Sequence, residues 1–125
     1  MHTTGAVATS VILPRQVMAC LGKIKKNIKL GMIADLHQDV MHDGPARLKA
    51  FLDGMKEENP DALLQLGDFA YPTKKNEAVT KAFEKAHPRT LHVLGNHEID
   101  GGHSFDAVAK LWGMKGRYYT ENVNG

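Results

Sequence analysis

The stretch that decides the fold is Ile28 to Ala34, I-K-L-G-M-I-A, which runs directly into Asp35-Leu36-His37. A short apolar run that contains β-forming residues is typical of a buried strand. Two further runs of the same kind follow along the chain, at Ala62 to Leu66 and at Thr90 to Leu94. The sequence therefore predicts three short strands, each of which ends at a polar segment.

The segments that follow these strands have helical spacing. Asp43-Gly44-Pro45 is an N-cap and first-turn signature, Asn59-Pro60 ends that helix, and Ser104 caps a third helix. The apolar positions of the three helices are Leu48, Phe51, Leu52 and Met55; Ala78, Val79, Ala82, Phe83 and Ala86; and Phe105, Val108, Leu111 and Trp112. We expect a fourth strand over Tyr118 to Val123.

The expected order is strand, helix, strand, helix, strand, helix, strand. Such alternation indicates an α/β fold whose sheet is mostly parallel and is covered by helices. The sequence ends on Asn124-Gly125, a dipeptide that strongly favours a hairpin turn when it follows a strand. We therefore expect the chain to stop within a turn and to form the first half of a larger domain.

Composition excludes several classes of protein. The 125 residues carry a net charge of +2, which is too balanced to indicate a nucleic-acid-binding protein. The one cysteine, Cys20, excludes an intrachain disulfide and a cysteine-rich zinc site. We expect no transmembrane helix, because no run of eighteen apolar residues occurs.

Candidate metal ligands follow each of the three predicted strands. Asp35 and His37 come after the first, Asp68 after the second, and Asn96 and His97 after the third. Because ligands of open α/β sheets bind beyond the carboxyl ends of the strands, we expect these side chains to meet at one edge. Oxygen and imidazole donors without thiolates suit divalent Mn, Fe or Zn.

The three motifs resemble those of the calcineurin-like metallophosphoesterase family. They are D-L-H at 35–37, G-D at 67–68 and G-N-H-E at 95–98, and the resemblance covers residues 28–125. It implies a β-sandwich flanked by helices, of which this chain holds the first half. It also implies a metal-dependent hydrolase of small-molecule phosphate esters that uses two divalent metal ions and a metal-bound hydroxide.

The resemblance assigns a role to each matching residue. It implies that Asp35 and His37 bind the first metal, that Asn96 binds the second, and that Asp68 bridges both. It also implies that His97 donates a proton or positions phosphate. Glu98, which completes the motif, is expected to support the site rather than to bind metal.

The family supplies further histidines from two later motifs, an isolated histidine and a G-H-x-H, and neither is present in the 125 residues. The one histidine after His97 is His103, which we expect in a loop near the site. We therefore expect residues 1–125 alone to turn over little substrate. Two alternatives stay open: a phosphodiesterase acting on nucleotides or glycerophosphodiesters, and a non-catalytic module that binds metal or phosphate.

Several other residues near the motifs have ordinary structural interpretations. Tyr71, in G-D-F-A-Y, has the spacing of the iron-binding tyrosine of purple acid phosphatases, but we expect it to pack as a wall of the site. Asp43 is expected to cap a helix and His42 to face solvent or substrate. His92 is expected to be a buried histidine of the sheet.

Residues 1–27 form a separate N-terminal arm in this interpretation. The apolar run Ala6 to Leu13, followed by Cys20 and a basic segment, resembles a bacterial secretory signal of the lipoprotein type. This resemblance predicts export, with Cys20 as the point of lipid attachment. The alternative is a loosely packed arm on a cytoplasmic protein.

Overall fold

The structure, a computed structural model, describes residues 27–124. The arm predicted over residues 1–27, with Cys20 and its predicted lipid attachment, lies outside these residues except for Asn27. The elements, in chain order, are β1 (Leu30–Ile33), α2 (Gly44–Glu58), β2 (Ala62–Gln65), the 3-10 turn η1 (Lys74–Asn76), α3 (Glu77–Ala86), β3 (Thr90–His92), the 3-10 turn η2 (His97–Ile99) and α4 (Phe105–Leu111). The predicted order is confirmed as far as the third helix.

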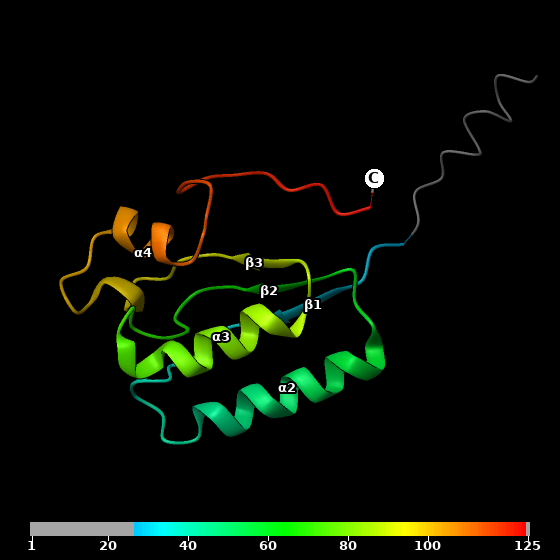
Figure 1. Cartoon of the computed structure of the whole chain (residues 1–125), viewed down its shortest axis with the longest axis horizontal. Coiled ribbons are helices and arrows are strands. Elements are labelled where there is room, and N and C mark those ends of the chain that lie inside the picture. The colour runs from blue at the N-terminus through cyan, green and yellow to red at the C-terminus, as the bar shows by residue number, and fades with distance from the viewer. Residues whose placement is uncertain (1–26, 125) are drawn as a thin grey trace, which may run out of the picture.

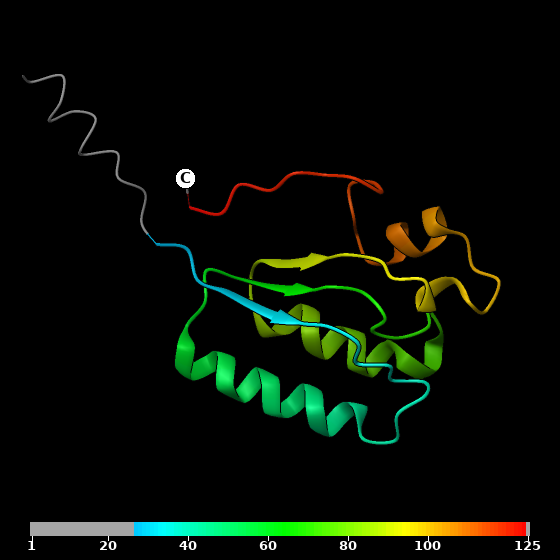
Figure 2. The same ribbon diagram turned by 180° about the vertical axis from the view of Figure 1, so that it is seen from behind.

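The three strands form one parallel sheet in the order β1-β2-β3. Met32 pairs with Leu64, and Leu64 pairs with Leu91 in the next strand. Helices α2 and α3 cover one face of the sheet, whereas α4 and the C-terminal segment lie on the other side (Figures 1 and 2). The fold is therefore α/β, and because the strands are parallel, their carboxyl ends meet at one edge.

The core lies between the sheet and the helices and continues to the end of α4. Leu63 of β2 and Phe83 of α3 are almost completely buried, and Phe69, directly after the second motif, is fully buried. The Phe69 ring lies 5.4 Å from the Phe83 ring and 5.6 Å from the Trp112 ring. Trp112 is thus a core residue, and its packing fixes the loop that carries Asp68.

The helix ends confirm most of the predicted boundaries. Asn59 adopts the left-handed conformation that ends α2, with a φ of 47°, and the Oγ of Ser104 accepts the amide of Ala107 at 3.2 Å. Asp43 stands at the N-cap position of α2, but its side chain makes no capping hydrogen bond. The predicted cap is therefore wrong in its chemistry, because the Asp43 carboxylate instead accepts Nε of Arg47 at 3.0 Å.

The fourth strand predicted over Tyr118 to Val123 is wrong. That segment has no strand structure, although it passes beside β3 (Figure 1). The Tyr119 hydroxyl accepts the amide of His92 at 3.0 Å and donates to the His92 carbonyl at 2.6 Å. A tyrosine side chain thus takes the two backbone groups that a neighbouring strand would pair at this position.

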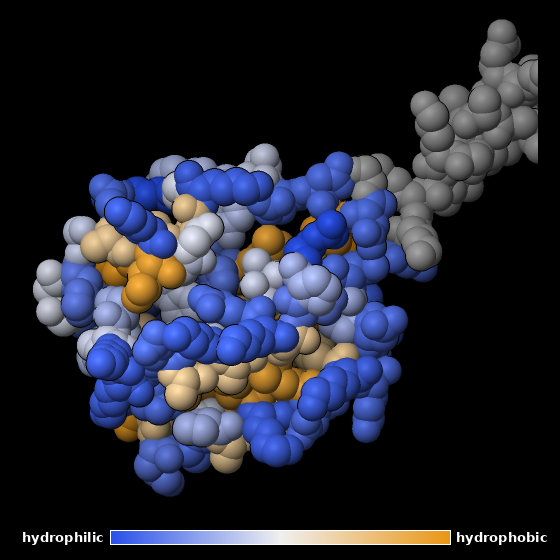
Figure 3. Space-filling model, in the orientation of Figure 1, coloured by the Kyte–Doolittle hydropathy of each residue, from blue (hydrophilic) through white to orange (hydrophobic). Residues whose placement is uncertain are grey.

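The sheet face opposite α2 and α3 is apolar. A cavity of about 710 Å³ lies between this face and the C-terminal segment, with Leu64 and Leu91 on the sheet side and Tyr118 on the other. Figure 3 shows apolar side chains below the C-terminal segment as well as along the line between α2 and α3. Within residues 27–124, no helix is long and apolar enough to cross a membrane.

Candidate metal centre

The loops after β1 and β2 hold three site residues in an uncommon backbone conformation. Asp35, His37 and Asp68 have φ angles of 53°, 47° and 52°, in the left-handed region that non-glycine residues seldom adopt. Such strain costs on the order of 1–3 kcal/mol per residue and persists where the surroundings fix it. Backbone hydrogen bonds fix it here, because the His37 amide donates to the Asp68 carbonyl at 2.9 Å and the Asp35 amide to the Gly67 carbonyl at 3.2 Å.

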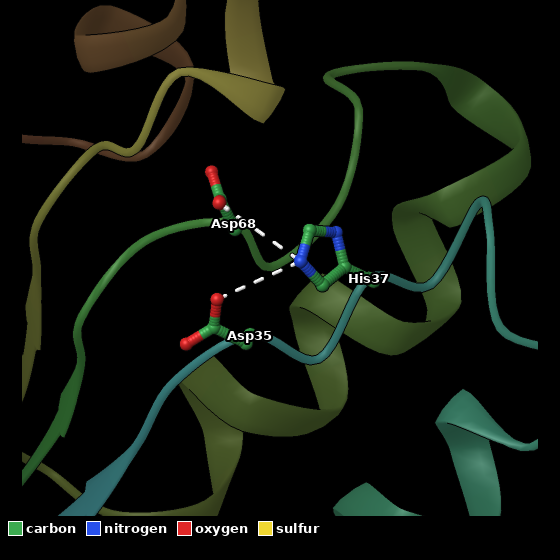
Figure 4. Close-up of side chains that lie close together, drawn as sticks. All are labelled: Asp35, His37 and Asp68. Carbon is green, nitrogen blue, oxygen red and sulfur yellow. Dashed lines mark ion pairs between the residues drawn. The ribbon is translucent and has the colours of Figure 1, made fainter.

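These three residues form a compact donor group. Nε2 of His37 lies 3.6 Å from Oδ1 of Asp35 and 3.9 Å from Oδ2 of Asp68 (Figure 4). One donor atom from each residue lies within 4.8 Å of the other two, which is close enough to share a metal ion. The Asp35 side chain is 68% exposed and that of Asp68 20%, so the group opens to solvent on the Asp35 side.

Two glycines allow the second and third loops to touch. Gly67, whose φ is +100°, is so close to Gly95 that a Cβ on Gly67 would lie 2.6 Å from the Gly95 nitrogen. A Cβ on Gly95 would lie 2.1 Å from Oδ1 of Asp68. Glycine is therefore required at both positions, because a side chain at Gly67 would strike the Gly95 backbone and one at Gly95 would strike the Asp68 carboxylate.

Glu98 connects the same two loops through backbone hydrogen bonds. Its fully buried carboxylate accepts the amides of Asp68 at 3.1 Å, Phe69 at 2.7 Å and Gly95 at 2.9 Å. Three backbone donors compensate the buried charge, which would otherwise be strongly unfavourable. The expectation that Glu98 supports the site rather than binds metal agrees with this geometry.

The third loop brings the His97 backbone to the Asp68 carboxylate. The His97 amide donates to Oδ1 of Asp68 at 2.9 Å. Asn96 directly precedes η2 and is exposed. Both residues that flank Asn96 are held in place, because the Gly95 amide donates to Glu98 and the His97 amide donates to Asp68.

The His97 ring is enclosed on three sides. Its centroid lies 4.4 Å from that of Tyr71, in a stacked arrangement, and 4.8 Å from that of His37, edge to face. Nδ1 lies 3.3 Å from Oδ2 of Asp100. Nε2 is buried and has no hydrogen-bond partner. A buried imidazole nitrogen without a partner is uncommon in folded proteins, and here it leaves Nε2 as the ring nitrogen with an unused hydrogen-bonding position.

Several supporting residues were missed by the sequence analysis. Arg47 donates to the Leu36 carbonyl within the first loop, and its Nη1 lies 3.5 Å from the Asp35 carbonyl. Asp100 follows His97 by three residues, a spacing that brings side chains together in a helical turn and was the available signal for it. Asp39 and Asn76, which contact Tyr71, were also missed, because no local sequence pattern indicates these contacts.

Within residues 27–124, the histidines other than His37 do not belong to this donor group. His92 is 5% exposed and lies 4.7 Å from the Trp112 ring, as a buried sheet histidine should. Burial lowers the pKa of His92 to about 4, so it is neutral at pH 7. His42 is exposed and His103 lies half-buried in the loop before α4. Neither belongs to the Asp35–His37–Asp68 group.

The comparisons with known proteins give one match. The family model of calcineurin-like phosphoesterases matches residues 28–125, which includes all three motifs and all the described strands and helices. No curated protein and no solved structure matches the chain. The match extends over more than half of the chain, and it agrees with the resemblance carried by the three motifs.

Proposed function

The chain belongs to the calcineurin-like phosphoesterase family, and on that premise we propose that its three loops form the metal site of a phosphate-ester hydrolase. The observation that carries this proposal is the meeting of Asp35, His37 and Asp68 within 4.8 Å of one another at the carboxyl edge of the sheet. Three strained or strictly packed loops converge on these donors. Packing alone does not require that arrangement.

The donor set fits divalent metal ions. In this proposal Asp35 and His37 hold the first ion, Asp68 bridges, and Asn96 holds the second. Carboxylate, imidazole and amide oxygen donors suit Mn, Fe or Zn. When bound, two such ions supply charge stabilisation of the phosphoryl oxygens and a nucleophilic water at neutral pH. The exposure of Asp35 leaves one side of the group open to a phosphate ester.

His97 is proposed to act on the departing group. Its Nδ1 faces the Asp100 carboxylate, and its partnerless Nε2 is the ring nitrogen left for a substrate oxygen. In this proposal Nε2 hydrogen-bonds a phosphate oxygen or protonates the leaving alkoxide, as an imidazole can near neutral pH. The carboxylate of Asp100 stabilises the charged ring when it holds the proton.

We also propose that hydrolysis needs ligands in addition to these three motifs. Asp35, His37, Asp68 and Asn96 give four donors for two ions, which is few for a dinuclear centre. The family adds histidines from an isolated position and from a G-H-x-H. Neither motif occurs in residues 1–125, where the single histidine after His97 is His103. In this interpretation residues 28–125 are the N-terminal part of the catalytic domain.

Hydrolysis of p-nitrophenyl phosphate and of its bis ester, with Mn²⁺ or Zn²⁺ and with EDTA, tests the proposal. Residues 1–125 are compared with a longer chain that includes the residues encoded after Gly125. We expect metal-dependent hydrolysis by the longer product, abolished in Asp68→Ala, and at most weak hydrolysis by residues 1–125. The preferred ester separates monoesterase from diesterase activity. Metal binding without hydrolysis by the longer product would contradict the enzymatic proposal and favour a binding module.

A further inference from the structure

We propose that Tyr71 is a positioning residue that fixes the plane of the His97 ring, an inference that rests on the role proposed for His97. The two ring centroids lie 4.4 Å apart with an interplanar angle of 26°. Tyr71 therefore presents the face of its ring to the imidazole. A tyrosine that ligates a metal would have to present its hydroxyl to the metal group instead.

Tyr71 covers one face of the His97 ring. His37 lies against the ring edge to face, at 71°, and Asp100 holds Nδ1. Because a carboxylate can only accept, Nδ1 carries the hydrogen of this bond and the neutral ring has its lone pair at Nε2. The stacked Tyr71 ring resists rotation of the imidazole about its χ angles, so Nε2 keeps its direction.

The position of Tyr71 is itself fixed by a partly buried polar network. The Tyr71 amide donates to Oδ2 of Asp39 at 2.7 Å. The fully buried Asn76 side chain donates to the Tyr71 carbonyl at 2.9 Å and to Oδ1 of Asp39 at 2.8 Å. Asp39 stands in the same loop as His37, two residues later. The first motif loop thus controls both His37 and the tyrosine that stacks on His97.

Tyr71 does not serve to fill the hydrophobic core. Tyr71 is half-buried. It lines a cavity of about 360 Å³, together with Pro72 and Trp112. Loss of the ring would therefore leave one face of His97 next to open space. We infer that the imidazole would then sample several orientations instead of one.

NMR of the His97 ring in residues 1–125 tests this inference without any need for turnover. The variants are Tyr71→Phe, which keeps the stacked ring, and Tyr71→Leu, which removes it; His97→Gln identifies the His97 signals among the seven histidines. We expect Tyr71→Leu to remove the ring-current shift of the His97 carbon-bound protons and to broaden them. Tyr71→Phe should retain both. Tyr118→Leu, at a tyrosine that is 96% exposed, is the matched control.

A second variant covers the case in which Tyr71→Leu does not fold. Asp39→Asn keeps the Tyr71 ring but sets an amide N–H against the Asn76 side chain, and it should broaden the His97 signals in the same direction. Unchanged His97 signals in the folded Tyr71→Leu or Asp39→Asn variants would overturn the positioning role. A loss of the His97 ring shift in Tyr71→Phe would also overturn it, because the hydroxyl would then be the essential group.

Hydrolysis by an active, longer product gives an independent readout. If Tyr71 orients the group that protonates the leaving oxygen, Tyr71→Leu should slow hydrolysis of phenyl phosphate by roughly 10- to 100-fold. It should slow hydrolysis of p-nitrophenyl phosphate much less, because that leaving group needs little protonation. Equal losses on both esters would contradict the inference. Absence of hydrolysis in every form would instead contradict the proposed function, while the NMR result would still decide the positioning of the ring.

Discussion

The backbone amide of His97 donates a hydrogen bond to Oδ1 of Asp68 at 2.9 Å. This bond leaves Oδ2 of Asp68, 3.9 Å from Nε2 of His37, as the oxygen that faces the first motif. One carboxylate therefore connects the third loop with the donors of the first loop. Because of this double role, substitutions of Asp68 can separate metal binding from the stability of the loops.

Asp68→Asn and Asp68→Ala should have different effects on the free energy of unfolding. Asparagine keeps an oxygen for the His97 amide, whereas alanine leaves that amide without a partner, at a cost of about 1–2 kcal/mol. Both variants remove the negative charge that a cation needs. Thermal or urea denaturation without metal should therefore show a loss in Asp68→Ala and little change in Asp68→Asn.

Added metal should distinguish both variants from the unsubstituted chain. At a concentration about 100-fold above its dissociation constant, Mn²⁺ or Zn²⁺ should raise the free energy of unfolding by about 2.7 kcal/mol, and EDTA should reverse the effect. Neither variant should respond. Asp53→Asn, at a carboxylate of α2 that pairs with Lys49, is the control and should keep the response. A full metal response in Asp68→Ala would show that Asp68 is not a ligand.

The strands, the helices and the donor residues could be predicted because their signals are local. Largely apolar runs of five to seven residues mark β1, β2 and β3, and helical spacing marks α2 from Leu48 onward. Parallel strands bring their carboxyl ends to one edge. Hence the sequence predicts that Asp35, His37 and Asp68 lie close together, but it does not predict the distances between them.

What could not be predicted depends on contacts between distant segments. Asp39 and Asn76 are 37 residues apart, and nothing in either local pattern indicates that they meet on Tyr71. The segment from Tyr118 has the composition of a strand, but a strand requires a pairing edge along its length. At His92 the side chain of Tyr119 takes the backbone groups instead.

Gly95→Ala should damage the metal site more than its small size suggests. The new methyl group would lie 2.1 Å from Oδ1 and 2.8 Å from both the Cγ and the backbone nitrogen of Asp68, so the loops must separate. We expect a loss of about 1–3 kcal/mol in the free energy of unfolding. Metal affinity, measured by isothermal titration calorimetry, should fall at least about tenfold. A tenfold fall corresponds to a loss of about 1.4 kcal/mol of binding free energy through displacement of the Asp68 ligand.

Gly54→Ala is the matched control for this substitution. Gly54 lies within α2, and a Cβ there would meet nothing within 4 Å. Alanine should therefore stabilise the helix by up to about 1 kcal/mol and leave metal affinity unchanged. Wild-type metal affinity in Gly95→Ala would show that the second and third loops can separate without moving Asp68.

Glu98→Gln should destabilise the chain even though the two side chains have nearly the same shape. The carboxylate of Glu98 accepts three backbone amides through both of its oxygens. Glutamine has one oxygen, and its NH₂ group would face at least one of these donors. We expect a loss of about 2–4 kcal/mol by urea denaturation, because charge-assisted bonds are replaced by a clash of donors. Glu57→Gln, at an exposed position of α2, should change the stability by less than about 0.5 kcal/mol; an equally small effect at position 98 would contradict the bridging role of Glu98.

The pH dependence of stability should report the burial of His92. Burial lowers the pKa of His92 from 6.5 to about 4, so the folded state binds its proton less readily than the unfolded state does. The free energy of unfolding should therefore be unaffected by this group above about pH 6.5 and should fall as the pH decreases toward 4. The shift corresponds to a loss of about 3 kcal/mol.

Gln65 lies beside the His92 ring and adds a geometric obstacle to protonation of Nδ1, next to the burial that lowers the pKa of His92. Oε1 of Gln65 accepts the Gly67 amide at 2.7 Å, which turns its Nε2 toward Nδ1 of His92 at 3.5 Å. A proton on Nδ1 would therefore face another donor. His92→Asn, whose oxygen can replace Nδ1 as the acceptor, should lose the part of the pH dependence between 6.5 and 4 that is due to the imidazole. Urea denaturation of this variant, of wild type and of His42→Asn, at an exposed histidine, measures the difference. If wild type and His92→Asn had parallel pH profiles, His92 would not be the group that titrates.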